Sequence, residues 1–397
     1  MKEIAKRVSH IGPSATLALS QRADELLAQG KPIINLTVGE PDFDTPQHIK
    51  DAAIKAIQQG LTKYTAVDGM KALKQAILTK LAHENKLDYQ LKQILVSCGA
   101  KHSLFNLFQA LLNPGDEVII PAPYWVSYPD MVKLAEARPV IIETDIKQHF
   151  KMSAEQLEAA ITAQTKALII NSPCNPTGFA YSPSELKAFG DILVKYPEII
   201  VITDDIYEHI LWAELPFTNI LNACPALYER TVVINGVSKA YAMTGWRIGY
   251  AAGPDKLIAA MKIIQSQSTS NPCSIAQAAS IEALQGDQSS IRLMTQSFKT
   301  RHDLLVKALS SMPGVKCLPA DGTFYSFPCI QDVLYQSASL TTDIELSDYL
   351  LNEAHLAVVP GSAFGAPGYL RISFATSTEN LEVAMKRMKE AIQKLRK

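Results

Sequence analysis

The chain has 397 residues, which is enough for one large or two ordinary domains with a sizeable hydrophobic core. Its 38 basic and 39 acidic residues leave a formal net charge of -1. Such a balance gives no global electrostatic reason to expect a nucleic acid or an anionic membrane as a partner. With 47% hydrophobic residues, the composition also excludes a disordered chain.

The N-terminal segment is charged and lacks an apolar h-region, so we expect no secretory signal. No apolar stretch reaches the length of a membrane-spanning helix. The six cysteines form no CxxC pair, so neither a disulfide framework nor a zinc site is expected. We therefore expect a cytoplasmic protein with reduced thiols and no metal.

Helical and strand patterns alternate along the first three quarters of the chain. Apolar periodicity predicts helices at 45–59, 69–83, 101–112 and 184–196. Short apolar runs predict strands at 93–97, 117–121, 167–171, 199–203, 231–235 and 248–252. Short apolar strands separated by helices are typical of a mostly parallel sheet covered on both faces. The sequence therefore predicts an α/β fold.

The pattern changes near residue 297. A charged helix is predicted at 298–311, followed by a strand at 322–325 and a helix at 346–354. The chain then ends in an amphipathic helix at 379–395. These elements predict a second, smaller α+β domain.

Several common site motifs are missing from the sequence. There is no GxGxxG after the first strand, and no GxxxxGK[ST], HExxH or GxSxG. Four polar clusters remain, each at the end of a predicted strand. Ligands bind at such strand ends in open α/β sheets.

The first cluster follows the strand that ends at Asn235 and contains Lys239 and Arg247. A lysine is most often simply solvated, but an apolar setting would lower its pKa and free the amine. A neutral amine is what a Schiff base with an aldehyde cofactor requires. Arg247 would suit a phosphate because its guanidinium is a planar fork.

The other three clusters are weaker when taken singly. Gly99 joins a strand to a helix whose start offers free N–H groups to an anion, although many helix starts look alike. Two prolines flank Asn175 and could hold its amide rigidly. The same residues fit an ordinary turn equally well. Asp204 and Asp205 end an apolar strand, where a buried carboxylate is costly unless it meets a cation. A protonated ring nitrogen of a ligand would provide such a cation.

Together these segments resemble the class I aminotransferases of fold type I, which use pyridoxal 5′-phosphate (PLP). The similarity is greatest to the bacterial aspartate aminotransferase branch. It is carried, in the family's order, by 39–46, 171–178, 204–207, 239–249 and 370–375. The resemblance implies a homodimer with shared active sites. It also implies a large PLP-binding domain over 45–296 and a discontinuous small domain of 1–44 with 297–397.

The family resemblance implies a role for each residue of the reacting centre. Lys239 would hold PLP as a Schiff base and act as the base that moves the substrate Cα proton. Asp204 would keep the pyridine nitrogen protonated, because the family's Asp stands three residues before the Tyr. Asp205 would then face the other way along the strand. Asn175 and Tyr207 would hydrogen-bond the phenolic oxygen of PLP.

The same resemblance assigns the ring face and the phosphate. Trp125 would stack on the ring, although the residues alone favour a core aromatic at that position. The phosphate would be held by Arg247, by backbone at Gly99, Ala100 and Lys101, and by Tyr64 from the neighbouring subunit. The family often has a Ser three residues before the Lys. Here that position is Gly236, so a side-chain contact from it is not expected.

Substrate recognition is implied in the same way. Arg371 would bind the α-carboxylate bidentately, and the backbone of Gly39 would approach the substrate. In other aspartate aminotransferases a partner-subunit Arg binds the distal carboxylate, and Ser266 stands at that position here. In the present branch Lys101 would take that task. The substrate-site residues implied by the resemblance are Ser14, Thr16, Gly39, Lys101, Trp125, Asn175, Ser266 and Arg371.

The implied reaction is ping-pong transamination, in which L-aspartate and 2-oxoglutarate give oxaloacetate and L-glutamate. Some relatives of this branch transaminate prephenate and carry a basic residue before Pro13. Gly12 stands there in this chain, which weighs against prephenate. An aromatic amino acid aminotransferase and a PLP-dependent lyase of the same fold remain alternatives. A PLP-sensing regulator would need an added DNA-binding segment, for which we expect no room before the family pattern begins.

Overall fold

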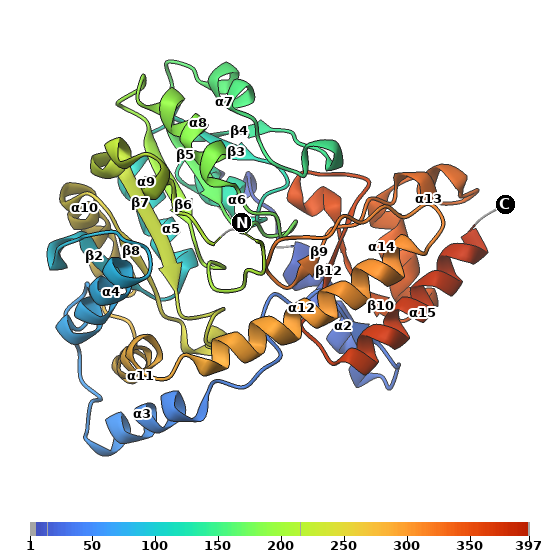
Figure 1. Ribbon diagram of the computed structural model, residues 1–397, viewed down its shortest axis with the longest axis horizontal. Helices are drawn as coiled ribbons and strands as arrows, with labels where there is room; N and C mark the ends of the chain where they lie inside the picture. The colour runs from blue at the N-terminus through green and yellow to red at the C-terminus, as the bar shows by residue number, and fades with distance from the viewer. Residues whose placement is uncertain (1–4, 14, 215, 396–397) are drawn as a thin grey trace.

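A computed structural model describes residues 5–13, 15–214 and 216–395 of the chain. Its centre is a seven-stranded sheet with the strand order β2-β8-β7-β6-β5-β3-β4 (Figure 1). The strands are β2 (Ile94–Ser97), β3 (Glu117–Pro121), β4 (Arg138–Ile142), β5 (Thr165–Asn171), β6 (Ile200–Asp204), β7 (Thr231–Gly236) and β8 (Gly249–Ala252). Strand β8 is antiparallel to both neighbours, whereas the other adjacent pairs are parallel. The predicted α/β fold is confirmed.

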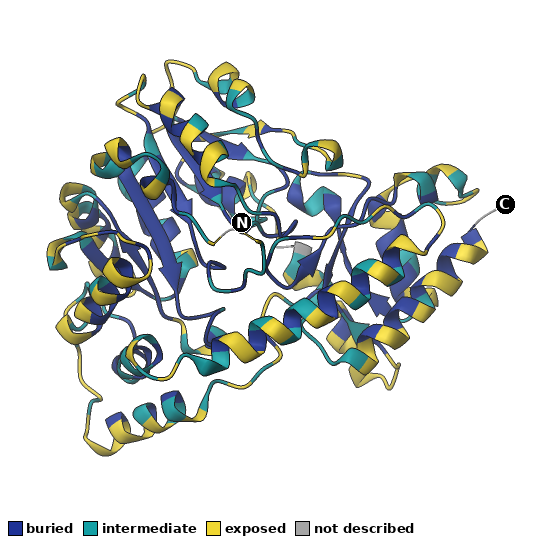
Figure 2. Ribbon diagram, in the orientation of Figure 1, coloured by how far each residue is buried: buried dark blue, intermediate teal, exposed yellow. Residues whose placement is uncertain are grey.

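Helices cover both faces of this sheet, because successive strand residues point to opposite faces. Ile94, Leu168 and Val201 pack on the face covered by α3 (Gln47–Gln58), α4 (Lys71–His83), α7 (Ala154–Ala160), α8 (Pro183–Leu193), α9 (Ile220–Ala223) and α11 (Ser274–Gln285). Their neighbours Leu95 and Ile202 pack on the other face. That face is covered by α5 (Ala100–Leu111), α6 (Ser127–Leu134) and α10 (Asp255–Ser266). The interior strands β7 and β8 are therefore buried on both sides (Figure 2).

The rest of the chain forms a smaller part beside the large sheet (Figure 1). A three-stranded antiparallel sheet has the order β11-β12-β9. Its strands are β9 (Tyr325–Ser326), β11 (Val359–Pro360) and β12 (Leu370–Ser373). The helices of this part are α12 (Ser289–Ser310), α13 (Gln331–Gln336), α14 (Asp343–Glu353) and α15 (Thr378–Leu395).

The N-terminal segment joins this smaller part. Strand β1 (Ile34–Asn35) pairs in parallel with β10 (Leu356–Ala357). Before it come α1 (Lys6–Ser9) and α2 (Ala15–Ala28). The expected domain limits at 44/45 and 296/297 stay a prediction, and α12 runs unbroken across the second of them.

Two predicted elements differ most from the structure in their limits. The helix expected at 298–311 begins at Ser289 in α12, because Ile291 and Met294 extend the buried stripe of Phe298 toward the N-terminus. The strand expected at 322–325 is reduced to its last residue in β9. Gly322 and Thr323 instead donate backbone hydrogen bonds to the loop residues Gly178 and Ile210.

One edge of the large sheet gathers the predicted polar clusters. The parallel strands β5, β6 and β7 end there, and the antiparallel β8 begins there. The segments after β6 and β7 and the residues just before β8 therefore meet at this edge. None of the described helices is long and apolar enough to cross a lipid bilayer.

Candidate active site

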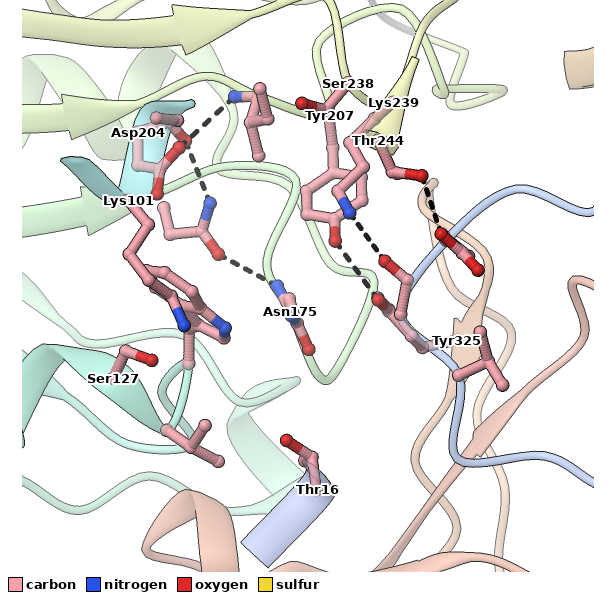
Figure 3. Close-up of a pocket in the computed structure, with 18 of the residues that line it drawn as sticks. Thr16, Lys101, Ser127, Asn175, Asp204, Tyr207, Ser238, Lys239, Thr244 and Tyr325 are labelled. Atoms are coloured by element: carbon pink, nitrogen blue, oxygen red, sulfur yellow. Dashed lines mark hydrogen bonds between the residues drawn. The ribbon is translucent and has the colours of Figure 1, made fainter. Parts of the chain in front are cut away.

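A cavity of about 460 Å³ lies at this edge, with walls from both sheets and from α2 (Figure 3). Most of the side chains that the sequence singled out face it. The predicted residues that line the cavity are Thr16, Gly39, Ala100, Lys101, Trp125, Asn175, Asp204, Tyr207, Lys239, Arg247 and Arg371. Residues as far apart in the chain as Thr16 and Arg371 thus meet in one place.

Lys239 projects its amine into the cavity from the loop after β7 (Figure 3). Its Nζ donates a hydrogen bond of 2.5 Å to the carbonyl oxygen of Gly39. Among the described residues, no carboxylate lies within ion-pair distance of this amine. Burial lowers the pKa of Lys239 to about 8, helped by Arg247 and Arg371 and opposed chiefly by Glu40. A sizeable fraction of neutral amine is therefore available near neutral pH.

Asp204 ends β6 and is 4% exposed. Its Oδ2 accepts a hydrogen bond of 2.6 Å from the Tyr128 hydroxyl, and its Oδ1 accepts one of 3.4 Å from the Ile206 N–H. Burial raises the pKa of Asp204 to about 6, against the effect of these hydrogen bonds. No cation within the described part of the chain forms an ion pair with it. Such a carboxylate is suited to a cationic ligand.

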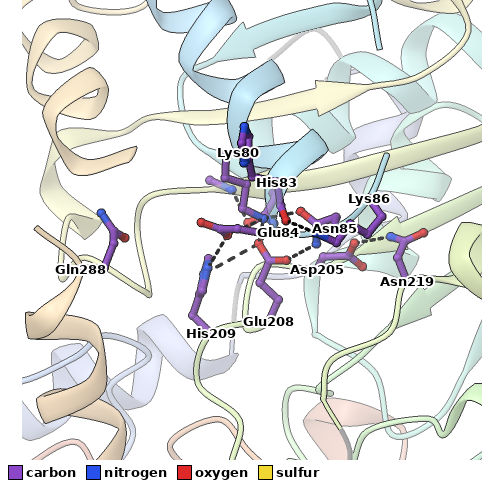
Figure 4. A network of polar contacts seen from close by, with 12 residues as sticks. Lys80, His83, Glu84, Asn85, Lys86, Asp205, Glu208, His209, Asn219 and Gln288 are labelled. Carbon is purple, nitrogen blue, oxygen red and sulfur yellow. Dashed lines mark hydrogen bonds and ion pairs between the residues drawn. The ribbon is translucent and has the colours of Figure 1, made fainter. Parts of the chain in front are cut away.

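The neighbouring Asp205 faces away from the cavity, as alternation along the strand predicted. It accepts hydrogen bonds from Thr203 and Asn219 in a buried polar network (Figure 4). Burial raises the pKa of Asp205 to about 8, and the charge of Glu208 adds to this.

Glu208 is the centre of that network. It accepts hydrogen bonds from Lys80, Asn85 and Asn235, which come from α4, the following turn and β7. Burial alone would raise the pKa of Glu208, but attraction to Lys80 lowers it to about 2. Glu84, Glu208 and His209 lie close enough to share a metal ion, yet the Lys80 ammonium already pairs with both glutamates. The network thus links α4, the turn after it and β7 to Glu208.

Two asparagine side chains connect Asp204 to Arg371 through hydrogen bonds. Asn171 donates to the Asp204 carbonyl oxygen at 2.9 Å and accepts from the Asn175 N–H at 2.9 Å. The Asn175 Oδ1 in turn accepts from Arg371 Nη1 at 3.1 Å. Hydrogen bonds therefore fix the loop at 171–178 as part of the site, and it is not an ordinary turn.

Arg371 lies on β12 and is 3% exposed. Its Nη2 donates to the Thr37 carbonyl oxygen at 2.6 Å, while its buried Nε has no hydrogen-bond partner. Its guanidinium carbon lies 4.4 Å from the ring centroid of Tyr325 and 5.0 Å from that of Phe364. No carboxylate in the described ranges pairs with it. A buried guanidinium with a free donor is a ready site for a carboxylate ligand.

Arg247 and the start of α5 form a second anion site. Arg247 Nη1 donates to the Thr244 carbonyl oxygen at 2.8 Å. A Cβ on Gly99 would lie 2.4 Å from Arg247 Nη2, and one on Gly249 would lie 2.1 Å from the Ala100 nitrogen. The guanidinium therefore lies against the glycine turn that leads into the helix, where N–H groups and the helix dipole favour an anion.

Gly236 shows why a side-chain contact is missing at its position. A Cβ there would lie 2.9 Å from both the Gly249 Cα and the Ile248 carbonyl oxygen. Strands β7 and β8 approach too closely at this point for a serine. Ser238 lines the cavity nearby, on the lysine loop.

Lys101 and Trp125 form another part of the cavity wall. The Nζ of Lys101 lies 4.9 Å from the Trp125 ring centroid. Burial lowers the pKa of Lys101, and the charge of Arg247 adds to this. The Trp125 ring packs edge-on against Tyr128, with the two ring centroids 5.2 Å apart, so Tyr128 supports the indole.

Four predicted residues are not among those that line the cavity. Gly99 lies behind Ala100, against Arg247. Tyr64 is 92% exposed, and Ser266 is exposed with its hydroxyl donating to Ile263. Roles for these two require a neighbouring subunit and stay predictions. Ser14 lies outside the described residues.

Three aromatic residues of the site were missed. Tyr128 stands three residues after Trp125, across the turn that leads into α6, and its backbone N–H donates to the Trp125 carbonyl oxygen. Tyr325 lies in the segment predicted as a strand, where its register relative to Arg371 was not foreseeable. Phe364 had no signal in the sequence beyond its apolar character.

The fold and the cavity define an α/β enzyme with a half-buried lysine amine, a buried carboxylate and two arginine anion sites. Residues 31–388 match the family model described as "Aminotransferase class I and II". The chain belongs to this family of aminotransferases, and its architecture is fold type I.

Relatives resemble it over nearly the full length. It is 55% identical to the aspartate/prephenate aminotransferase of Nitrosomonas europaea, over 97% of this chain and 98% of that protein. It is 49% identical to the aspartate aminotransferase of Geobacillus stearothermophilus, over 97% of this chain and 98% of that one. The solved aspartate aminotransferase of Rhizobium meliloti aligns over 100% of both chains with 48% identity and a TM-score of 0.96.

Proposed function

We propose that this aminotransferase uses PLP and transfers the amino group of L-aspartate to 2-oxoglutarate. The observation that carries the proposal is that the buried Arg371 guanidinium, whose Nε has no hydrogen-bond partner, shares one cavity with the Lys239 amine and with Asp204, which forms no ion pair among the described residues. The names of the relatives from Geobacillus and Rhizobium support aspartate as the donor.

The residues present fit PLP. Lys239 would hold its aldehyde carbon, Asp204 its ring nitrogen, and Arg247 with the start of α5 its phosphate. Asn175 and Tyr207 would hydrogen-bond its phenolic oxygen, and Trp125 would cover its ring. Bound PLP supplies an electron-accepting ring that stabilises negative charge on the substrate Cα.

Side chains of the protein would orient the substrate and transfer the proton. Arg371 orients the amino acid by its α-carboxylate, with the guanidinium fixed by Asn175 and Thr37. Lys239 Nζ takes the Cα proton and returns it, for which a pKa near the working pH is favourable. Asp204 keeps its charge toward the ring nitrogen because its carboxylate is tied to Tyr128.

Selection of a dicarboxylic substrate would rest on Lys101, with Thr16 on the adjacent wall of the cavity. Tyr64 and Ser266 would enter from the second subunit of a homodimer, and Ser14 would assist in binding the substrate. We place the protein in the cytoplasm, a proposal supported by the free state of all six cysteines.

Prephenate as an amino acceptor is a second candidate, favoured by the name of the Nitrosomonas relative. Against it stands Gly12, where relatives of this kind carry a basic residue. An added Cβ at Gly12 meets nothing within 4 Å, so packing does not require the glycine.

A substrate panel with the purified, PLP-loaded protein decides among these functions. We expect 2-oxoglutarate-dependent formation of oxaloacetate from L-aspartate, with a higher kcat/KM than for L-phenylalanine. Prephenate would be offered as the acceptor in a parallel assay with L-aspartate. Product formation from an amino acid without any 2-oxo acid would instead identify a lyase.

A further inference from the structure

Tyr325 and Arg371 lie on neighbouring strands of the small sheet. In the antiparallel pair of β9 and β12, Tyr325 stands opposite Ser373. Arg371 precedes Ser373 by two residues and therefore lies on the same face, diagonal to Tyr325. Long and aromatic side chains reach each other across such a diagonal. The observed distance of 4.4 Å from the guanidinium carbon to the Tyr325 ring centroid agrees with a cation–π contact.

The hydroxyl end of the same side chain reaches the large sheet. It lies 3.2 Å from the hydroxyl of Tyr207, in the turn after β6 (Figure 3). Tyr325 is 1% exposed and Tyr207 3%, so water does not compete readily for this hydrogen bond. A Cβ on Gly39 would lie 3.2 Å from the Tyr325 hydroxyl oxygen, which shows that the Gly39 backbone also packs there.

Tyr325 is thus the side chain that contacts both the buried guanidinium and the buried phenol. These two groups come from different sheets, and within the described part of the chain no hydrogen bond joins them directly. A phenol can donate and accept at once. When Tyr325 donates to the Tyr207 oxygen, the Tyr207 proton is left for an acceptor inside the cavity.

We propose that Tyr325 is a positioning residue that holds Arg371 and the Tyr207 hydroxyl in fixed relation. Its ring orients the guanidinium for the substrate carboxylate, and its hydroxyl aims the Tyr207 proton at the cofactor's phenolic oxygen. This inference rests on the proposed function. It adds that a carboxylate site and a proton-donor site, built on separate sheets, depend on one side chain.

Three variants separate the ring from the hydroxyl. Tyr325→Phe removes the hydroxyl and keeps the ring, whereas Phe364→Leu removes the other ring beside Arg371 and leaves Tyr207 untouched. Tyr325→Leu removes both features. Two equilibrium measurements are made on each PLP-loaded protein. The first is the Kd of maleate, a dicarboxylate without an amino group, and the second is the midpoint pH of the visible absorption band.

Tyr325→Phe should raise the midpoint pH by about 0.5 to 1 unit, because Tyr207 loses a hydrogen-bonding partner. Its maleate Kd should stay within about twofold. Phe364→Leu should weaken maleate binding by about 3- to 10-fold at an unchanged midpoint. Tyr325→Leu should show both effects. Because Tyr325→Phe is isosteric, it tests the proposal even if the leucine variants fail to fold.

A double variant gives the decisive control. In a Tyr207→Phe background, the further change Tyr325→Phe should no longer move the midpoint, because the pair acts as a unit. A shift that persists in that background would overturn the proposal, as would an unchanged midpoint in Tyr325→Phe alone. Failure of the proposed function looks different, since the wild-type protein would then develop no visible band with PLP.

Discussion

The hydroxyl of Tyr128 donates a hydrogen bond of 2.6 Å to Oδ2 of Asp204, and both side chains are buried. Burial raises the pKa of Tyr128 well above its ordinary value, and the adjacent Asp204 charge adds to this, so the phenol stays a donor. The Trp125 ring rests edge-on against the same tyrosine. One residue that the sequence did not single out therefore supports two that it did.

Replacing Tyr128 with Phe should weaken PLP binding by about 10-fold or more, because a hydrogen bond to a charged group contributes about 1.5–3 kcal/mol. Without that donor the Asp204 carboxylate is held less firmly in its charged form. Equilibrium dialysis of the cofactor gives the Kd. Tyr124→Phe is the matched control, since Tyr124 precedes the same helix but does not line the cavity. Equal affinity in Tyr128→Phe and wild type would show that this contact does not support the cofactor site.

Replacing Lys101 with Ala should lower kcat/KM for L-aspartate by about 10- to 100-fold, because the distal carboxylate loses a charged partner. The values for L-alanine and L-phenylalanine should change by less than about threefold. Steady-state kinetics on the three donors measure this difference. Lys187→Ala, which alters an exposed ion pair with Asp191, serves as the control. An equal loss for all three donors would remove Lys101 from substrate selection.

Replacing Gly236 with Ser should destabilise the protein by about 1–3 kcal/mol, because the new Cβ would press on β8. The affinity for PLP should not improve, although the family's serine at this position touches phosphate. Urea unfolding and cofactor titration measure the two effects. Gly245→Ser is a suitable control, since an added Cβ there meets nothing within 4 Å. Tighter PLP binding without loss of stability would contradict the packing argument.

The rate of PLP capture by the cofactor-free protein should rise with pH and level off above about 8. The pKa of Lys239 is lowered to about 8, and only the neutral amine attacks the aldehyde. Below that value each unit of pH should reduce the rate about 10-fold. Stopped-flow absorbance from pH 6 to 10 gives the profile. A rate that keeps rising to pH 10 would mean that the amine behaves like an ordinary solvated lysine.

Much of the fold was predictable from local patterns. The strand at 117–121 coincides with β3, and the helices at 45–59 and 69–83 correspond to α3 and α4 within two residues at each end. These elements are buried on a regular apolar face, so their periodicity is visible in the sequence. Strand β4 lies at the sheet edge and is only partly buried, which is why its pattern was too weak to predict.

Within the candidate site, only the residues that belong to a recognisable motif could be predicted from the sequence. Asp204 ends a strand, Lys239 and Asn175 follow strands, and all three face one cavity. Tyr128 and Tyr325 act through their contacts with Asp204, Tyr207 and Arg371, and such contacts depend on helix packing and strand register. The local sequence does not determine this helix packing or this strand register. Tyr64 is exposed in the single chain, so its predicted role depends on a second subunit.

The most direct test of the account is an absorbance spectrum of the purified protein with PLP, before and after L-aspartate is added without any 2-oxo acid. We expect a visible band that depends on Lys239 and that aspartate bleaches, with one oxaloacetate formed per site. Later addition of 2-oxoglutarate should restore the band and release L-glutamate. Lys239→Ala should show neither the wild-type band nor turnover. An unchanged wild-type spectrum after aspartate, or full turnover by Lys239→Ala, would contradict the central claim.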